Sequence, residues 1–192
     1  MSGKAQRVGY RLDSKDVKSL SRDDLITILR AADPLIMSGG RNLLAKILKG
    51  SKDKKLLEIG LDACPVYGYF KALNLSDIIA RIDWTILHGY LAIEYDYRLP
   101  LLVYTELGWE IEMDTYSSEL LDLLSEIADT LDAETDMSFL KDRNRKMIFM
   151  LLDKIRATGN RKLIPVLERW KQVEYKKVQQ RITEVIAEMS HD

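Results

Sequence analysis

The sequence predicts a mainly α-helical protein that contains a β-hairpin. Glycine and proline are scarce, at 10 and 4 of 192 residues, which leaves little room for long loops. Apolar residues recur with a helical period over most of the chain, but the period changes from 3.6 to 2 over residues 90–104. The resulting order of helices followed by a hairpin is that of a winged helix, a helix-turn-helix with a β-hairpin wing.

Three helices are expected before the clearest one. Residues 1–19 are polar and are expected to form a flexible arm. Ser21 can cap a first helix, which ends at Asp33-Pro34 because the residue before a proline avoids the helical region. A second helix is predicted over residues 41–48, and Ser51 is expected to cap a short third helix over residues 52–59.

The fourth helix has the most regular pattern in the chain, with Asn74 or Ser76 as its cap and Gly89 at its end. Its apolar stripe consists of Leu75, Ile78, Ile79, Ile82 and Ile86. Trp84 lies opposite this stripe, and an exposed aromatic side chain of that size is uncommon. We therefore expect another part of the chain to cover Trp84, either the helix around residues 25–29 or the helices after Tyr116.

The hairpin is predicted to pair residues 90–95 with residues 99–104 through a tight connection at residues 96–98. Helices are then expected over residues 117–131, 138–158, 161–171 and 175–189. These elements divide the chain into an N-terminal arm and helix (residues 1–38), a winged-helix domain (39–113) and a C-terminal helical region (114–192).

The net charge of −1 conceals a strong asymmetry along the chain. Residues 41–60 contain six basic and two acidic residues, and residues 94–136 contain thirteen acidic residues and one basic residue. Residues 141–181 contain thirteen basic and four acidic residues. Two interpretations of the C-terminal basic residues are open: they pair with the acidic segment within the fold, or they contact DNA or a protein partner.

Several classes of protein are excluded by what the sequence lacks. No segment has the roughly 18 consecutive apolar residues of a membrane span, and the N-terminus does not have the pattern of a secretion signal. The single cysteine, Cys64, fits a reducing compartment, so we expect a cytoplasmic protein. With two histidines beside it, Cys64 cannot complete a zinc site. No catalytic or nucleotide-binding motif is present, so neither an enzyme nor a cofactor is expected.

Residues 47–55, with the sequence Ile-Leu-Lys-Gly-Ser-Lys-Asp-Lys-Lys, join a basic helix end to a lysine-rich helix start. Free N–H groups and ammonium groups placed together in this way hold phosphate well. An ordinary solvated turn is the alternative interpretation of this segment.

Four segments resemble, in order and spacing, the RQC domain, the winged-helix domain that follows the motor of RecQ helicases. They are residues 48–52, residues 67–71, residues 82–91 with His-Gly-Tyr-Leu at their end, and residues 101–108 with Tyr-Thr-Glu-Leu-Gly. The family uses this domain to bind duplex DNA at junctions and ends, with the wing hairpin separating the strands. The helicase motor and the zinc-subdomain cysteines are absent, so the resemblance implies a stand-alone relative without helicase activity.

The resemblance also implies which residues contact DNA. It places the segment around Ser51 near backbone phosphate, the segment from Lys71 to Ser76 at the start of the recognition helix, and Tyr97 at the wing tip. There Tyr97 is expected to stack on a terminal base pair, although Glu94 and Asp96 beside it repel phosphate. The complete expected set is Lys49, Ser51, Lys52, Lys55, Lys71, Asn74, Ser76, Tyr97 and Arg98.

The C-terminal region is similar to a HEAT-type repeat over residues 162–167 and 175–178, with Pro165 inside a helix where that repeat often kinks. Residues 142–155 resemble the second helix of an earlier repeat. Because helical repeats usually stack in threes or more, a short HEAT-like region and a plain helical bundle are both open.

These observations favour a non-enzymatic protein that contacts duplex or junction DNA through the phosphate backbone, in DNA repair, recombination or replication. The alternative is a protein–protein adaptor whose winged helix no longer binds DNA. The lysines of residues 49–55 favour DNA, and the acidic segment favours the adaptor. The expected partners are DNA and a protein bound by the C-terminal helices, and the oligomeric state does not follow from the sequence.

Overall fold

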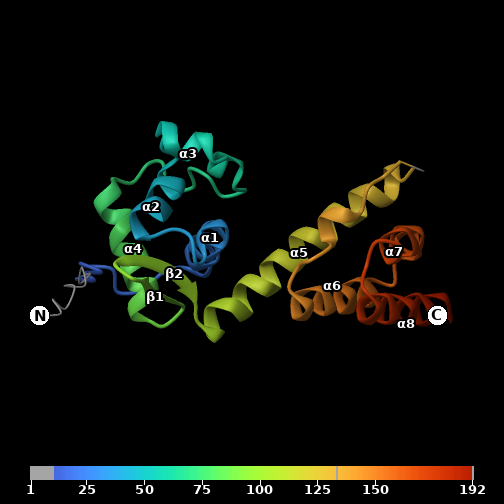
Figure 1. Cartoon of the computed structure of the whole chain (residues 1–192). Helices are drawn as coiled ribbons and strands as arrows, with labels where there is room; N and C mark the ends of the chain where they lie inside the picture. The colour runs from blue at the N-terminus through green and yellow to red at the C-terminus, as the bar shows by residue number, and fades with distance from the viewer. Residues whose placement is uncertain (1–10, 133, 192) are drawn as a thin grey trace, which may run out of the picture. The chain divides into compact units, whose positions relative to one another are not determined.

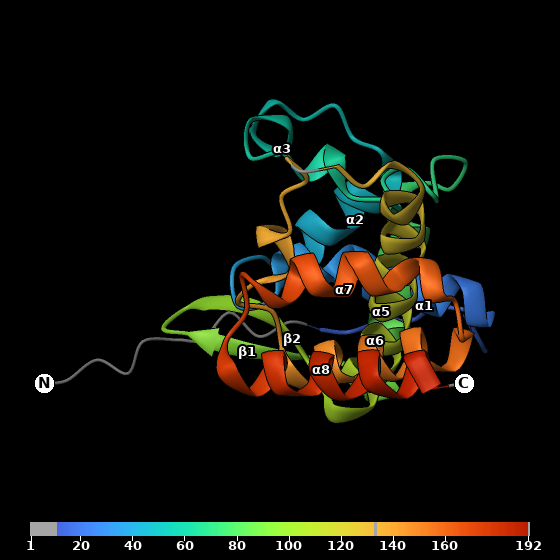
Figure 2. The same ribbon diagram turned by 90° about the vertical axis from the view of Figure 1, so that its right-hand side faces the viewer.

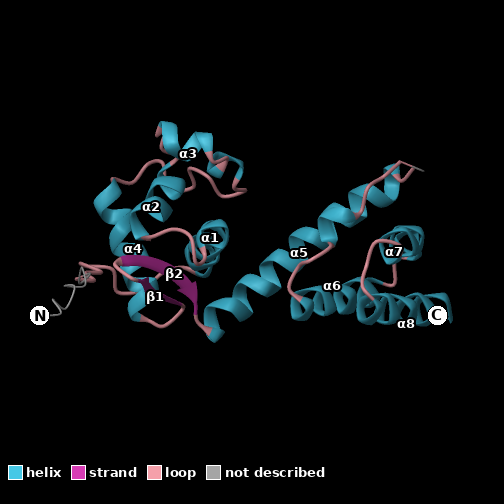
Figure 3. Cartoon of the chain, viewed as in Figure 1, coloured by secondary structure: helices cyan, strands magenta, loops and turns pink. Residues whose placement is uncertain are grey.

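The computed structural model describes residues 11–132 and 134–191. The chain divides into two compact units, residues 1–112 and residues 113–192 (Figure 1). The mainly helical class with one antiparallel hairpin is confirmed (Figure 3). Within the described residues, no helix is both long enough and apolar enough to cross a membrane.

The first unit is built from helices packed on a hairpin. Its elements are α1 (Arg22–Ala32), α2 (Arg41–Lys49), α3 (Lys54–Glu58), α4 (Leu75–Leu87), β1 (Leu91–Asp96) and β2 (Leu99–Tyr104). Helices α1, α2 and α4 pack against one another. Fully buried aliphatic residues, among them Ile28, Leu44, Ile78 and Ile82, form the core between them. Burial of this apolar surface is the main force that holds the three helices together.

Two helix starts and one helix end agree with the sequence. Ser21 caps α1, because its hydroxyl accepts a hydrogen bond from the Asp24 amide at 3.0 Å. Helix α1 ends at Ala32, directly before Asp33-Pro34. Of the two candidate caps for α4, Asn74 is the one used, since its Oδ1 accepts from the Asp77 amide at 2.9 Å.

The hairpin pairs Leu91 with Tyr104 at its base and Asp96 with Leu99 at its turn. Tyr97 turns the chain with a φ of 52°, in the left-handed region that non-glycine residues seldom adopt. Buried Leu91 and Leu102 anchor the base, and Leu102 also exchanges backbone hydrogen bonds with Met37 and Gly39. The turn end extends beyond the helices of this unit (Figure 2).

The prediction for α3 is corrected in both its cap and its length. Asp53 is the cap, because its Oδ1 accepts from the amides of Lys55 at 3.1 Å and Leu56 at 3.3 Å. The helix therefore begins at Lys54, and it ends at Glu58. Ser51 is not the cap, because its hydroxyl accepts from the amide of Asp53, one residue before the helix, at 3.3 Å.

Residues 11–19 are not a flexible arm, which corrects that part of the prediction; residues 1–10 lie outside the described residues. The Asp13 amide donates to Oδ2 of Asp83 at 2.8 Å, and Nε1 of Trp84 donates to the Lys18 carbonyl at 3.3 Å. Trp84 is accordingly only 8% exposed. Cover by another part of the chain is confirmed, but the hydrogen-bonded cover is the segment before α1, which neither of the two predicted elements includes.

The second unit contains most of α5 (Glu106–Thr130) with α6 (Arg145–Thr158), α7 (Ile164–Lys171) and α8 (Lys176–His191). Helix α8 packs against both α6 and α7, around the fully buried Trp170 and Ile182. Helix α5 begins eleven residues before the predicted start at residue 117, directly after the hairpin.

Two further expectations for this unit are corrected. Residues 138–158 do not form one helix: Ser138–Leu140 is a 3-10 turn, Asp142 has a φ of 63°, and Asn144 caps α6. Pro165 does not kink a helix, since it lies in the first turn of α7, where its missing N–H has no intrahelical partner to lose.

Candidate nucleic-acid interface

The end of α2 is tied to the loop that leads into α4. Backbone amides of Gly68 and Phe70 donate to the carbonyls of Ile47 at 2.9 Å and Leu48 at 2.8 Å. The Lys49 ammonium donates to two carbonyls of the same loop, those of Lys71 at 2.7 Å and Leu73 at 2.6 Å. The α2–α3 connection and the start of α4 therefore lie side by side, and Lys49 holds them together.

The four segments singled out in the sequence meet in two pairs. Gly50, with a φ of 71°, lies against Gly68 so closely that a Cβ on Gly50 would be 3.0 Å from the Gly68 Cα. The Tyr67 hydroxyl donates to the Ser51 carbonyl at 2.8 Å. In the second pair, the Thr105 hydroxyl donates to the Gly89 carbonyl at 2.6 Å. The segments are thus the contacts that fix α2 to α4 and α4 to α5.

Three exposed lysines lie on the α2–α3 connection, on α3 and on the loop before α4. The ammonium groups of Lys52, Lys55 and Lys71 have no ion-pair partner among the described residues, and we call these three residues the lysine patch. Lys54, which the sequence reasoning did not select, adds a charge to the same run, with its side chain 91% exposed and 3.7 Å from Glu58. Its position in the sequence between Lys52 and Lys55 could have indicated it as a further contact residue.

The N–H groups at the start of α3 are not open to phosphate, contrary to the expectation from the sequence. Asp53 occupies them, and Lys46 in turn donates to Asp53 at 2.7 Å. This hydrogen bond, with those from the Lys55 and Leu56 amides, lowers the pKa of the Asp53 carboxyl. Any phosphate contact here must rest on the ammonium groups of the lysine patch.

At the start of α4, the predicted contact residues are exposed but already engaged. Asn74 uses both ends of its amide on Asp77, with Oδ1 accepting at 2.9 Å and Nδ2 donating at 2.6 Å. The Ser76 hydroxyl accepts from the Lys15 ammonium at 2.6 Å. Lys15 is a cation that the sequence did not indicate, because 61 residues separate it from Ser76.

The middle of α4 is closed on both sides. Ile78 and Ile82 are buried in the core, while Asp83 and Trp84 are buried beneath residues 11–20. Arg41 holds Asp83 from α2 at 2.6 Å. The exposed parts of this helix are its first turn, with Lys71 before it, and its C-terminal end at Leu87.

The wing tip forms a separate region from the lysine patch. Figures 1 and 2 both show α3 at the upper end of the unit and the hairpin at the lower end, with α2 between them. Tyr97 is 94% exposed, and Arg98 beside it is exposed as well. Exposed Glu94 and Asp96 flank them. The structure thus unites the predicted residues of the α2–α3 connection with Lys71 but places Tyr97 and Arg98 elsewhere.

The core of three helices with a connected hairpin defines the first unit as a winged helix. The family model of the RQC domain matches residues 13–120, which is more than half of the chain. The chain belongs to the RQC domain family. The match takes in the segment that covers Trp84 and extends into α5. Neither a curated protein nor a solved structure matches the chain.

The RQC domain is a non-catalytic winged-helix module of a DNA-binding family. In the part of the chain that the structure describes, no three residues among His, Cys, Asp and Glu are grouped so as to hold a metal ion.

Proposed function

We propose that this protein is a non-enzymatic DNA-binding protein whose winged-helix domain, residues 39–113, contacts duplex or junction DNA through the phosphate backbone. The observation that carries the proposal is the lysine patch, three exposed lysines without an ion-pair partner among the described residues, in a member of a DNA-binding family. Lysine binds phosphate as a point charge, and phosphate contacts carry no sequence information. Binding is therefore expected to depend little on base sequence.

The closed middle of α4 shapes the proposed contact. Since Asp83 and Trp84 are buried, the middle of α4 does not enter a groove of the DNA. In the proposed complex, the first turn of α4 approaches the DNA backbone. The wing tip supplies a second contact, with Tyr97 stacking on an exposed base pair and Arg98 reaching phosphate. Stacking of one base on an aromatic side chain contributes about 1–3 kcal/mol, which opposes the repulsion from Glu94 and Asp96.

The proposed role belongs to DNA repair, recombination or replication, the processes in which junctions and ends of duplex DNA arise. Cys64 is the one cysteine of the sequence and cannot form a disulfide within the chain, which supports a reducing, cytoplasmic location. The proposed partners are DNA and a protein bound by the C-terminal helices.

The lysine patch is tested by Lys52→Gln combined with Lys55→Gln in the full chain. Loss of two phosphate contacts should lower the slope of log K against log salt by about 2 and weaken duplex binding about 50-fold at 0.1 M salt. All DNA sequences should be affected alike, and the melting temperature should stay unchanged because both side chains are exposed. Fluorescence anisotropy with two unrelated duplexes measures the effect.

The matched control is Lys162→Gln combined with Lys171→Gln, which removes the same charge from the second unit. Both control lysines already bind carboxylates, Lys162 to Asp129 at 3.1 Å and Lys171 to Glu168 at 2.9 Å. If the patch variant binds duplex as tightly as this control, the proposed phosphate contact at residues 52–55 is refuted.

The adaptor function remains the second candidate because apolar side chains are exposed near the lysine patch. Leu57 is 41% exposed, Ile59 56% and Tyr69 49%. Aromatic and aliphatic residues of this kind often form the buried centre of a protein–protein contact. Failure of the wild-type protein to bind duplex DNA at low salt would favour this candidate.

A further inference from the structure

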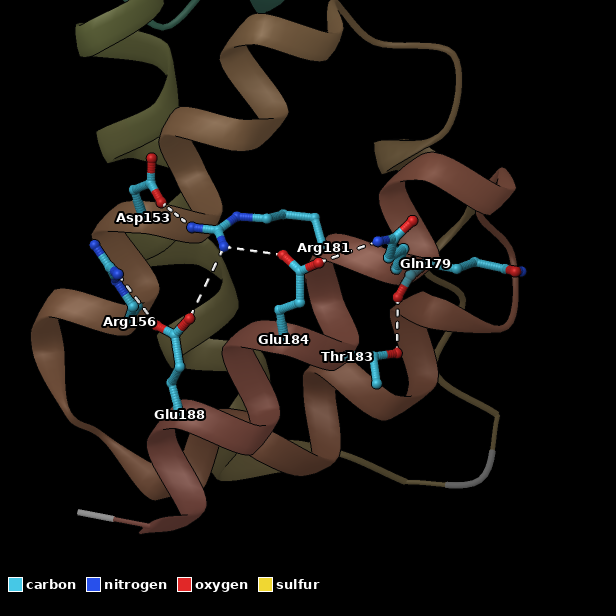
Figure 4. Close-up of polar contacts among 8 residues, drawn as sticks. Asp153, Arg156, Gln179, Arg181, Thr183, Glu184 and Glu188 are labelled. Atoms are coloured by element: carbon cyan, nitrogen blue, oxygen red, sulfur yellow. Dashed lines mark hydrogen bonds and ion pairs between the residues drawn. The ribbon is translucent and has the colours of Figure 1, made fainter.

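Eleven of the thirteen basic side chains of residues 141–181 fall into two groups. The other two, Arg161 and Arg169, donate to the backbone carbonyls of Ser190 and Asp132. Those of the first group bind carboxylates; Figure 4 shows Arg181 between Asp153 and Glu184, and Arg156 bound to Glu188 at 3.1 Å. The members of this group are Lys154, Arg156, Lys162, Lys171 and Arg181. Pairing within the fold, one of the two interpretations of the basic C-terminal region, accounts for these five residues.

The second group has no ion-pair partner among the residues that the structure describes. Its members are Lys141, Arg143, Arg145, Lys146, Lys176 and Lys177. All six lie in two short stretches, residues 141–146 before and at the start of α6 and residues 176–177 at the start of α8. Pairing within the fold leaves them unexplained.

The two stretches line one hollow of about 610 Å³. Arg143, Arg145, Lys176 and Lys177 supply four cations to its lining, and Tyr175, which is 57% exposed, lies between them in the same wall. Arg143 is held in place, because its Nε donates to the Phe139 carbonyl at 2.7 Å and its guanidinium bonds the Tyr116 hydroxyl. The hollow is therefore an ordered concave surface with an excess of positive charge.

The two carboxylates of the lining are occupied by structural hydrogen bonds. Glu174 is buried and accepts from the Trp170 indole at 2.9 Å and from the Tyr175 amide at 3.2 Å. Asp142 accepts from the Tyr175 hydroxyl at 2.7 Å, which raises the pKa of that phenol. Both acids thus hold Tyr175 in the wall of the hollow. Among the described residues, neither acid forms an ion pair with a cation of the hollow.

The positions of the cations are unfavourable for the isolated fold. A helix start carries partial positive charge, so acidic residues stabilise the first turn and basic residues destabilise it. Helix α1 follows this rule with Asp23 and Asp24, whereas the first turns of α6 and α8 contain no acidic residue. Bound anions would neutralise both the side chains and the helix starts.

We propose that this hollow binds backbone phosphates of DNA and is a second contact, separate from the winged helix. The inference rests on the proposed function for the choice of DNA as the polyanion, and on the hollow itself for the site. Four unpaired cations in one concave wall fit the regularly spaced phosphates of a nucleic acid backbone. An acidic protein segment is the rival occupant that the experiment must separate.

The test is Lys176→Gln combined with Lys177→Gln in the full chain, titrated with duplex DNA at several salt concentrations. The slope of log K against log salt should fall by about 2 relative to wild type. The melting temperature should rise by about 1–3 °C, because two cations leave a helix start. The control Lys162→Gln with Lys171→Gln should keep the wild-type slope and should not raise the melting temperature.

The comparison with Lys52→Gln/Lys55→Gln separates this inference from the proposed function. If the variant at Lys176 and Lys177 matches the control while the lysine-patch variant loses affinity, the hollow is not a DNA contact and the proposed function stands. If only the variant at Lys176 and Lys177 loses affinity, the hollow is the contact and the lysine patch is not. Binding of poly-glutamate but not duplex by the wild-type protein, lost in the Lys176/Lys177 variant, would overturn the choice of DNA.

Discussion

Replacing Trp84 with alanine is expected to lower the free energy of unfolding by about 3–5 kcal/mol, as for other buried aromatic truncations. The side chain is 8% exposed and stacks on the His88 ring with 3.8 Å between centroids. Its indole N–H also donates to the Lys18 carbonyl, so the variant loses a bond that ties residues 11–20 to α4. Urea unfolding followed by circular dichroism measures the change.

Tyr97→Ala is the matched control for Trp84→Ala, since it truncates an aromatic side chain of the same unit that is 94% exposed. It should leave the urea midpoint within experimental error. The packing role of Trp84 would be contradicted if Trp84→Ala kept the wild-type urea midpoint but no longer bound DNA. Trp84 would then be a ligand contact, and α4 would reach DNA through its middle.

Asp83→Ala is expected to destabilise the protein by a similar amount, about 3–5 kcal/mol, because one partner of a buried ion pair is removed. The Asp83 side chain is 2% exposed and binds Arg41, whose side chain is 14% exposed, at 2.6 Å. The same carboxylate accepts from the Asp13 amide. The variant therefore removes the charge that offsets the Arg41 guanidinium and the acceptor that holds residues 11–20.

The double variant Arg41→Met with Asp83→Leu distinguishes the ion pair from simple packing. Replacing both charges by apolar side chains is often neutral, so the double variant should recover the part of the stability that Asp83→Ala loses through the ion pair. The part due to the lost acceptor for the Asp13 amide should not return. A double variant that is less stable than the single one, measured by the same urea titration, would contradict this explanation.

The parts of the fold that the sequence predicted are those governed by local rules. Periodicity located α1, α2, α4 and the hairpin within one or two residues, and local chemistry identified Ser21 as a cap and Asp33-Pro34 as a helix end. The family followed from four short segments, which the structure shows in contact in two pairs.

The errors arose where a long-range contact or a stronger local competitor decided the outcome. Residues 11–19 look like a polar arm in the sequence, but bonds to Asp83 and Trp84, 66 to 70 residues away, fix them on α4. The sequence favours Ser51 as the cap of α3. Asp53 takes that place because its carboxylate, two residues later, accepts from the amides of both Lys55 and Leu56.

The candidate site was predictable in composition but not in arrangement. Charge alone indicated Lys52, Lys55 and the basic residues after 141. Which of the C-terminal cations are paired depends on the packing of α5, α6 and α8, so the hollow at Arg145 and Lys177 has no signature in the sequence.

Salt dependence of duplex binding by the wild-type protein tests the central claim most directly. A blunt duplex titrated between about 50 and 200 mM salt should show a slope of log K against log salt of about −3 from the lysine patch alone, and a steeper one if the hollow also contributes. Binding that is absent at the lowest salt, or an affinity that does not change with salt, would contradict a phosphate-contacting DNA-binding protein.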